Sequence, residues 1–244
     1  MPSTFMKQFE FLDFCPELVR IYSAGHVVSP SGKRFDTGGC STVNNLLVLR
    51  NVFQNLRPRR TLEVGLAFGG SCLTFAALHR EAGVETSRQH VAIDPFQTSV
   101  WERLGILAVE RAGLSGYVEV REGLSCLQLP KMVERGEEYD MVYIDGSHLF
   151  EDVFVDAYFA SRLLSAGGIM LFDDCRIPHV KKAIRFIRTN LADSLEEVDI
   201  GPFREDKGKS LKYRAARALH EVQMTAFKRI GPAVRKWDAS FRDF

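Results

Sequence analysis

Apolar and polar residues follow two different spacings along this chain. Short apolar runs that end at glycine or aspartate predict strands, and apolar residues recurring roughly every three to four positions predict helices. The predicted strands are 61–65, 90–94, 117–121, 140–145 and 169–172, with weaker candidates at 195–200 and 210–216. The predicted helices are 43–56, 71–82, 98–112, 124–134, 150–164, 179–191 and 220–237.

The order of these elements indicates the fold class. Strands that alternate with helices are typical of a doubly wound parallel sheet. We therefore expect an α/β fold, with a Rossmann-like sheet of about seven mostly parallel strands and helices on both faces. The chain divides into an N-terminal arm or lid at 1–42, a core at 43–218 and a basic C-terminal helix at 219–244. In such a sheet the ligand lies beyond the carboxyl ends of the strands.

Composition narrows the class of protein. The chain has 244 residues, 45% of them hydrophobic, which suffices for one full core. Its formal net charge of +1 argues against nucleic-acid binding. The five cysteines lack a paired spacing, so we expect free thiols in a reducing compartment. No apolar run reaches the ~18 residues of a membrane span, and the first residues lack a signal-peptide pattern. We therefore expect a cytoplasmic protein with no membrane partner.

The glycine turn after the first predicted strand is the most informative motif. It reads Glu63-x-Gly65-x-x-x-Gly69, and it lacks both the middle glycine of a GxGxxG motif and the lysine of a Walker loop. Glycines let the backbone approach a ligand, and the helix that follows directs its first N–H groups toward it. Asp94 ends the second strand, where an acidic residue can accept both hydroxyls of a ribose.

Three carboxylates end two further strands. Asp145 closes the fourth predicted strand, and Asp173 and Asp174 close the fifth. Neighbouring strands lie about 4.8 Å apart, so the carboxylates would repel one another unless a cation neutralised them. Oxygen ligands suit Mg²⁺ first, and Mn²⁺ or Ca²⁺ as well. The alternative is that Asp173 and Asp174 cap a loop and only Asp145 touches the ligand.

Together these motifs resemble those of the class I S-adenosylmethionine-dependent methyltransferases over about residues 43–191. The segments 118–125, 139–148 and 163–174 further resemble metal-dependent O-methyltransferases, of the catechol type and of the macrocin type that methylates antibiotic sugars. The resemblance implies S-adenosyl-L-methionine as cofactor, a divalent metal, and a seven-stranded sheet with an antiparallel last strand. It assigns the metal to Asp145, Asp173 and Asp174, and the cofactor to Glu63, Gly65, Gly69, Asp94, Gly123, Leu124 and Ser125.

His148 is the candidate general base, and acts with Asp145. Imidazole titrates near neutral pH, so it can take a proton from a substrate hydroxyl. By the resemblance, His148 stands at the position of the catalytic lysine of the catechol enzymes. The sugar-modifying type can use an acid one residue earlier, where this chain has Ser147. A histidine that only begins the next helix is the alternative.

The sequence thus predicts a metal-assisted O-methyltransferase that acts on a hydroxyl of a small molecule, such as a sugar, a phenol or another secondary metabolite. Three alternatives stay open: a metal-free methyltransferase with His148 as base, a nicotinamide-dependent oxidoreductase, and a non-catalytic module that keeps the fold for partner binding. The aromatic N-terminal arm and the basic C-terminal helix are the candidate surfaces of a homodimer. No motif specifies the acceptor.

Overall fold

The computed structural model describes residues 10–38, 40–83, 87–205, 208 and 210–244. The first nine residues of the predicted arm lie outside this description. The chain forms two compact units, one made of residues 1–57 and 66–123, the other of residues 58–65 and 124–244.

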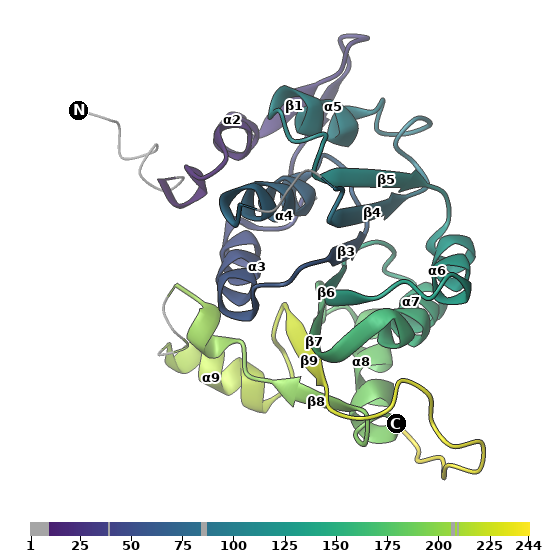
Figure 1. Cartoon of the computed structure of the whole chain (residues 1–244). Helices are drawn as coiled ribbons and strands as arrows, with labels where there is room; N and C mark the ends of the chain where they lie inside the picture. Colours follow the sequence, from purple (N-terminus) through teal and green to yellow (C-terminus); the bar gives the residue numbers. More distant parts are fainter. Residues whose placement is uncertain (1–9, 39, 84–86, 206–207, 209) are drawn as a thin grey trace. The chain divides into compact units, whose positions relative to one another are not determined.

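Seven strands among the described residues make one sheet, in the order β5-β4-β3-β6-β7-β9-β8 (Figure 1). The strand pairs β4–β5, β3–β6 and β6–β7 are parallel, whereas β9 runs antiparallel to both β7 and β8. The predicted α/β fold, with its mostly parallel sheet and antiparallel last strand, is confirmed. The strands are β3 (Thr61–Val64), β4 (His90–Asp94), β5 (Val118–Glu122), β6 (Tyr139–Ile144), β7 (Leu164–Phe172), β8 (Leu195–Val198) and β9 (Thr225–Arg229).

The first unit surrounds β4 and β5 with four helices and an N-terminal hairpin. Helix α3 begins after Thr42, whose hydroxyl accepts a hydrogen bond from the backbone N–H of Asn45 at 3.2 Å, as expected of an N-cap. Besides β4 and β5, the described residues of the first unit form a 3₁₀ turn η1 (Glu10–Leu12), α2 (Pro16–Ala24), the antiparallel pair β1 (His26–Val28) and β2 (Arg34–Asp36), α3 (Val43–Leu56), α4 (Gly70–Glu81) and α5 (Leu104–Arg111).

Helix α5 is shorter than predicted. Instead of a helix from residue 98, the chain turns until Leu104, and the backbone N–H of Arg103 donates to the carbonyl of Gln97 at 2.6 Å. Glu102 and Arg103 have φ angles of 46° and 60°, which no α-helix accommodates. The apolar spacing of this stretch is therefore compatible with a helix, but the local turn prevails.

The second unit packs α6 (Ser125–Glu134), α7 (Phe150–Leu163) and α8 (Pro178–Asn190) against its strands, with a 3₁₀ turn η2 (Gly201–Phe203) and α9 (Leu211–Ala218) in the long connection between β8 and β9. The last four residues of β6 and of β7 are all buried. Strands buried on both faces read as continuous apolar runs, which explains why the sequence located β6 and the buried second half of β7, whereas the start of β7 at Leu164 was missed.

The C-terminal third corrects two predictions. Residues 210–216 were expected as a strand but begin α9, whose cap is the hydroxyl of Ser210. The expected basic helix at 219–244 is wrong, because residues 225–229 form the strand β9, whose first three residues are buried. Pairing with β7 places Thr225 opposite Phe172 and covers the edge of the sheet. The stabilisation from this pairing outweighs the helix that the local apolar spacing favours. The dimer surface expected on that helix therefore loses its basis.

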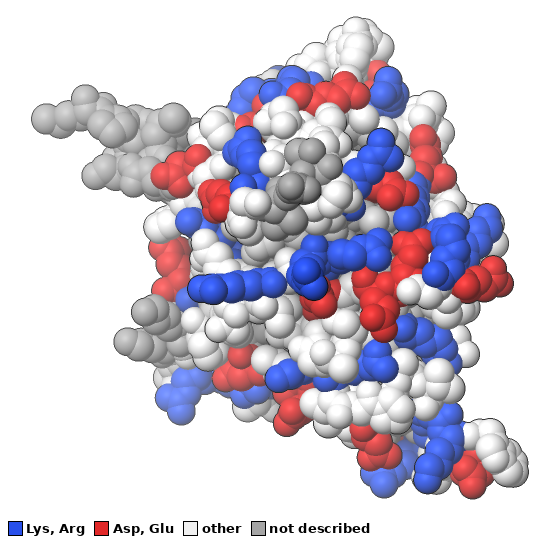
Figure 2. All heavy atoms as spheres, viewed as in Figure 1, with Lys and Arg blue, Asp and Glu red and all other residues white. Residues whose placement is uncertain are grey.

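Basic and acidic side chains are interspersed over the face drawn in Figure 2, as the near-zero net charge leads one to expect. None of the helices in the described part of the chain has the length and apolar character needed to cross a membrane.

Candidate functional site

In the first unit, Asp94 fixes the glycine turn. Its buried carboxylate, at the end of β4, accepts hydrogen bonds at Oδ2 from the backbone N–H groups of Leu66 (3.0 Å) and Ala67 (2.8 Å). The side-chain amide of Gln97 donates to the same oxygen (3.2 Å) and to the carbonyl of Ala67 (2.8 Å). The structure places Asp94 where the sequence predicted it. It also reveals this supporting role, which no motif indicated.

The glycines in and beside this turn allow backbone segments to pack closely. Gly69 is the N-cap of α4 with a φ of 88°, and a Cβ there would lie 3.3 Å from the carbonyl of Gly105. A Cβ on Gly105 would lie only 2.5 Å from the carbonyl of Ala67. Ala67 itself has a φ of 42°, an uncommon angle for a residue with a side chain. The backbone of this loop is therefore closely enclosed by the residues around it.

The connection between β5 and α6 holds the residues expected near an adenine. The backbone N–H of Gly123 donates to the carbonyl of Asp94 at 3.2 Å, so this glycine begins the connection beside the end of β4. Leu124 is exposed, and Ser125 is the first residue of α6. The contact with the adenine predicted for Gly123, Leu124 and Ser125 remains a prediction.

In the second unit, β3 carries Glu63 and ends at Val64, and Gly65 follows it. Glu63 is fully buried, and Gly65 has a φ of 97°. The backbone N–H of Asp145 donates to the carbonyl of Val64 at 2.9 Å, which draws the ends of β3 and β6 together. A Cβ on Gly65 would lie 2.2 Å from the carbonyl of Asp145, far inside contact distance. Only glycine therefore fits at this position.

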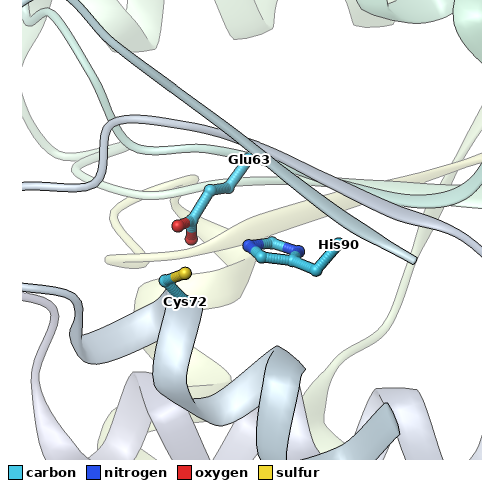
Figure 3. A group of neighbouring side chains, drawn as sticks. All are labelled: Glu63, Cys72 and His90. Carbon is cyan, nitrogen blue, oxygen red and sulfur yellow. The ribbon is translucent and has the colours of Figure 1, made fainter. Parts of the chain in front are cut away.

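Figure 3 draws Glu63 together with Cys72 of α4 and His90 of β4, all of them fully buried. Within the first unit, Cys72 and His90 each offer a ligand atom, and the two atoms lie within 4.8 Å of each other. The ring of His90 stacks on Phe75, with 4.9 Å between the ring centroids. Two protein ligands from one unit fall short of the three or four that hold a zinc ion, so we treat this pair as part of the core.

The second unit brings Asp145, His148 and Asp174 together. One donor atom from each lies within 4.8 Å of the other two, and His148 Nε2 lies 2.7 Å from Asp174 Oδ2. Asp174 has a φ of 53°, a region that aspartate occupies more readily than most residues, and the chain leaves β7 at this point. Two of the three carboxylates that the sequence singled out thus meet beside the predicted base.

Asp173 has a different environment. Its buried carboxylate accepts hydrogen bonds from the hydroxyl of Tyr143 at 2.6 Å and from the amide of Gln223 at 3.0 Å. The same amide of Gln223 also donates to Asp174 Oδ1 at 2.6 Å. Asp173 still continues the strand pairing, since its N–H donates to the carbonyl of Ile144, and successive strand residues face opposite ways. It therefore does not join the group formed by Asp145, His148 and Asp174.

Sequence reasoning missed Gln223. It lies 49 residues after Asp174, in the connection before β9, and no motif surrounds it. It lies seven residues beyond the end of the predicted strand at 210–216, and the structure shows that stretch to be a helix.

The donor set of Asp145, His148 and Asp174 fits a divalent cation. Ligand atoms lie roughly 2.0–2.5 Å from such an ion, so donors up to about 4.8 Å apart can share one. Two carboxylates and an imidazole suit Mn²⁺ or Zn²⁺ as well as Mg²⁺. The 2.7 Å contact is also a hydrogen bond in its own right. If His148 Nε2 carries the proton shared with Asp174, then Nδ1 keeps the lone pair.

Residues 62–175 match the family model Methyltransf_24, described as a methyltransferase domain. The O-methyltransferase hkm8 of Aspergillus hancockii is 29% identical over 118 residues, which cover 48% of this chain and 43% of that protein. The chain thus spans less than half the length of the curated relative that it matches.

Two solved structures resemble the whole fold. The O-methyltransferase from Bacillus cereus, in complex with SAH, has a TM-score of 0.58 and 18% identity, covering 89% of this chain and 90% of that one. The O-methyltransferase TomG from Streptomyces achromogenes, involved in tomaymycin synthesis and solved with SAM, has a TM-score of 0.61 and 15% identity, covering 91% and 90%. At these identities the likeness establishes the fold.

The family match begins within β3 and ends just after β7, so it includes the glycine turn, Asp94, Asp145 and Asp174. The seven-stranded sheet with its antiparallel last strand is the fold shared with the solved O-methyltransferases. Residues 62–175 thus match a methyltransferase domain, and the described chain has the fold of the solved O-methyltransferases.

Proposed function

We propose that the chain transfers the methyl group of S-adenosylmethionine to a hydroxyl of a small molecule, such as a sugar, a phenol or another secondary metabolite. The observation that carries the proposal is the group formed by Asp145, His148 and Asp174, which supplies a base and two carboxylates at the ends of β6 and β7. The names of the relative and of the solved structures, all O-methyltransferases, support oxygen as the acceptor atom.

The cofactor would be held by the residues around the glycine turn. Gly65 and Gly69 would let this closely packed loop lie beside the methionine end of the cofactor, and Glu63 would supply a carboxylate to the same site. Asp94 would bind the ribose. Its Oδ2 already accepts three hydrogen bonds, whereas Oδ1 accepts one, from the N–H of Phe96 at 2.7 Å. Oδ1 therefore has room for one ribose hydroxyl rather than two. Gly123, Leu124 and Ser125 would lie against the adenine.

Asp145 and Asp174 would hold a divalent cation, Mg²⁺ first. When bound, such a cation acts as a Lewis acid and lowers the pKa of an acceptor hydroxyl. Asp173, which the resemblance also assigned to the metal, would instead orient the loop through Tyr143 and Gln223. His148 takes the proton of the acceptor at Nδ1, and the carboxylate of Asp174 stabilises the imidazolium that results. Positioning of the acceptor in line with the methyl group supplies much of the remaining rate.

A metal-free reaction is the second candidate. The 2.7 Å contact between His148 and Asp174 favours it, because a carboxylate that fixes the tautomer of a histidine and stabilises its charged form makes it an effective base without a metal.

Calorimetry with Mn²⁺ tests the metal without any need for an acceptor. The wild-type chain should bind one ion, Asp145→Ala should lose that binding, and the exposed Asp238→Ala should retain it. In parallel, formation of S-adenosylhomocysteine with a panel of phenols and sugars should cease in EDTA and return with Mg²⁺. If the wild-type chain keeps full activity in EDTA and the Asp145→Ala variant is also fully active, the metal mechanism is contradicted, and a metal-free reaction with His148 as base is favoured. In that case His148→Ala should be inactive in EDTA.

A further inference from the structure

The second unit contains an apolar cavity of about 250 Å³ that the methyl-transfer site does not use. It lies between α7, α8 and the segment that follows β9, and that segment runs close to α8 in Figure 1. Its walls are built mainly of aromatic and aliphatic side chains, among them Phe154, Ala157, Ala183, Phe186, Ile187 and Val234.

Three arginines also line this cavity: Arg162 of α7, Arg229 at the end of β9, and Arg235. All three are half-buried, and their guanidinium groups donate to backbone carbonyls. Among the described residues, no acidic side chain lines the cavity and none of the three arginines forms a salt bridge. Partly desolvated cations without an anion are unfavourable, so this cavity is complementary to a negative group.

The cavity is far from the acidic residues of the candidate site. Arg229 donates to the carbonyl of Leu164, the first residue of β7, whereas Asp173 follows the last residue of that strand. The start of β7 is irregular: Leu164 pairs opposite Tyr139 and Phe172 opposite Ile144, so β7 spans only the length of β6, and at ~3.3 Å per residue its two ends lie on the order of 17 Å apart. A ligand in the cavity therefore cannot be the methyl acceptor at the same time.

We propose that this cavity binds a small amphiphilic carboxylate, with its hydrocarbon part between α7 and α8 and its carboxylate against Arg162 and Arg235. A guanidinium group can bind a carboxylate through two parallel hydrogen bonds, which provides affinity and orientation together. With ~30 Å³ for a water-sized group, 250 Å³ has room for roughly eight non-hydrogen atoms. That size holds the seven-carbon chain of octanoate, a medium-chain fatty acid, whose carboxylate would lie beside the arginines.

Octanoate, titrated into the full chain by calorimetry, is the probe. We expect one octanoate per chain, bound about tenfold or more tightly than 1-octanol, because the alcohol fills the cavity but cannot pair with an arginine. Arg162→Gln and Arg235→Gln should each weaken octanoate binding by about tenfold and leave octanol binding unchanged. Ala233→Leu, which narrows the cavity, should weaken both ligands.

Arg185→Gln is the matched control, because Arg185 is an exposed arginine of α8 outside the lining. It should bind octanoate as the wild-type chain does, and circular dichroism should show every variant folded. Three results would overturn the proposal: no octanoate binding by the wild-type chain, equal affinity for octanoate and octanol, or a loss in Arg185→Gln as large as in Arg235→Gln. The result does not depend on methyl transfer, since no variant touches the proposed active site.

Discussion

At the scale of single residues, the candidate site depends on one position that must lack a side chain. We expect Gly65→Ala to weaken cofactor binding by at least tenfold and to lower the melting temperature, because its Cβ would lie 2.2 Å from the carbonyl of Asp145. Calorimetry with S-adenosylmethionine and a thermal melt measure the two effects. Gly113→Ala is the control, because Gly113 shares the positive φ but has open space around it. Equal losses in both variants would mean that backbone strain alone is responsible.

A second residue makes stability depend on pH. Burial raises the pKa of Asp156 in α7 to about 7 from 3.8, against a smaller lowering by the hydroxyl of Ser125. Between about pH 4 and pH 7 the folded chain keeps a proton that the unfolded chain has released, so this group makes the free energy of unfolding fall as pH rises through that window. At about 1.4 kcal/mol per pKa unit, the loss is on the order of a few kcal/mol.

Asp156→Asn should remove this dependence, because the amide mimics the neutral acid. Urea melts at pH 5 and pH 8 should find the variant more stable than the wild-type chain at pH 8 and close to it at pH 5. Asp238→Asn, an exposed position, should keep the slope of the wild-type chain. A variant less stable at pH 8 would show that the charged carboxylate has a partner that burial alone does not reveal.

Side-chain direction is what the sequence left undetermined at this scale. That Asp145 and Asp174 follow strands was predicted from the apolar runs before them, and the structure shows that the two strands are neighbours. Which member of the Asp173–Asp174 pair faces His148 did not, because it depends on the residue where the chain leaves β7. The positive φ of Asp174 and its contact with Gln223 decide it, and both are tertiary facts.

At the scale of elements, the N-terminal hairpin supports the glycine turn. Phe35 of β2 packs edge-on against Phe68, which lies in the turn, with ring centroids 5.7 Å apart. Trp101 completes the cluster, 5.1 Å from Phe68 and 6.5 Å from Phe35. Such pairs contribute about 0.5–1.5 kcal/mol each beyond the area they bury. The predicted arm therefore packs on the cofactor loop in this structure, although a lid motion remains a prediction.

Phe35→Ala should lower the free energy of unfolding by about 2 kcal/mol and weaken cofactor binding several-fold, because the turn loses its support. Urea denaturation and calorimetry measure these effects. Val28→Ala, on the other strand of the hairpin and largely exposed, should leave both unchanged. Unaltered cofactor affinity in Phe35→Ala would restrict the hairpin to a packing role.

The contrast between β6 and β9 shows which elements can be predicted. Strand β6 is buried in the middle of the sheet, and its continuous apolar run has only one reasonable interpretation. Strand β9 has five residues, the last two of them Lys228 and Arg229, and it pairs with strands that are distant in sequence, so its short pattern fits a helical spacing equally well. Local pattern cannot settle an element whose stability comes from long-range pairing.

At the scale of the whole molecule, cofactor binding should raise the stability of the entire chain. A ligand present at a hundred times its dissociation constant adds about 2.7 kcal/mol to the free energy of unfolding. For a chain of this length that corresponds to a rise in melting temperature of roughly 5–10 °C. S-adenosylmethionine should produce this shift and NAD⁺ at the same concentration should not. A shift with NAD⁺ alone would favour an oxidoreductase, and no shift with either ligand would favour a non-catalytic module.

The position of β9 between β7 and β8 also has a consequence for how the chain folds during synthesis. β8 is made first, yet it can join the sheet only through β9, which follows after the long connection that contains α9. Until residue 229 has left the ribosome, β7 exposes an unpaired edge, and exposed edges recruit other chains. Nascent chains paused within that connection should therefore be the most prone to aggregate and the most dependent on chaperones.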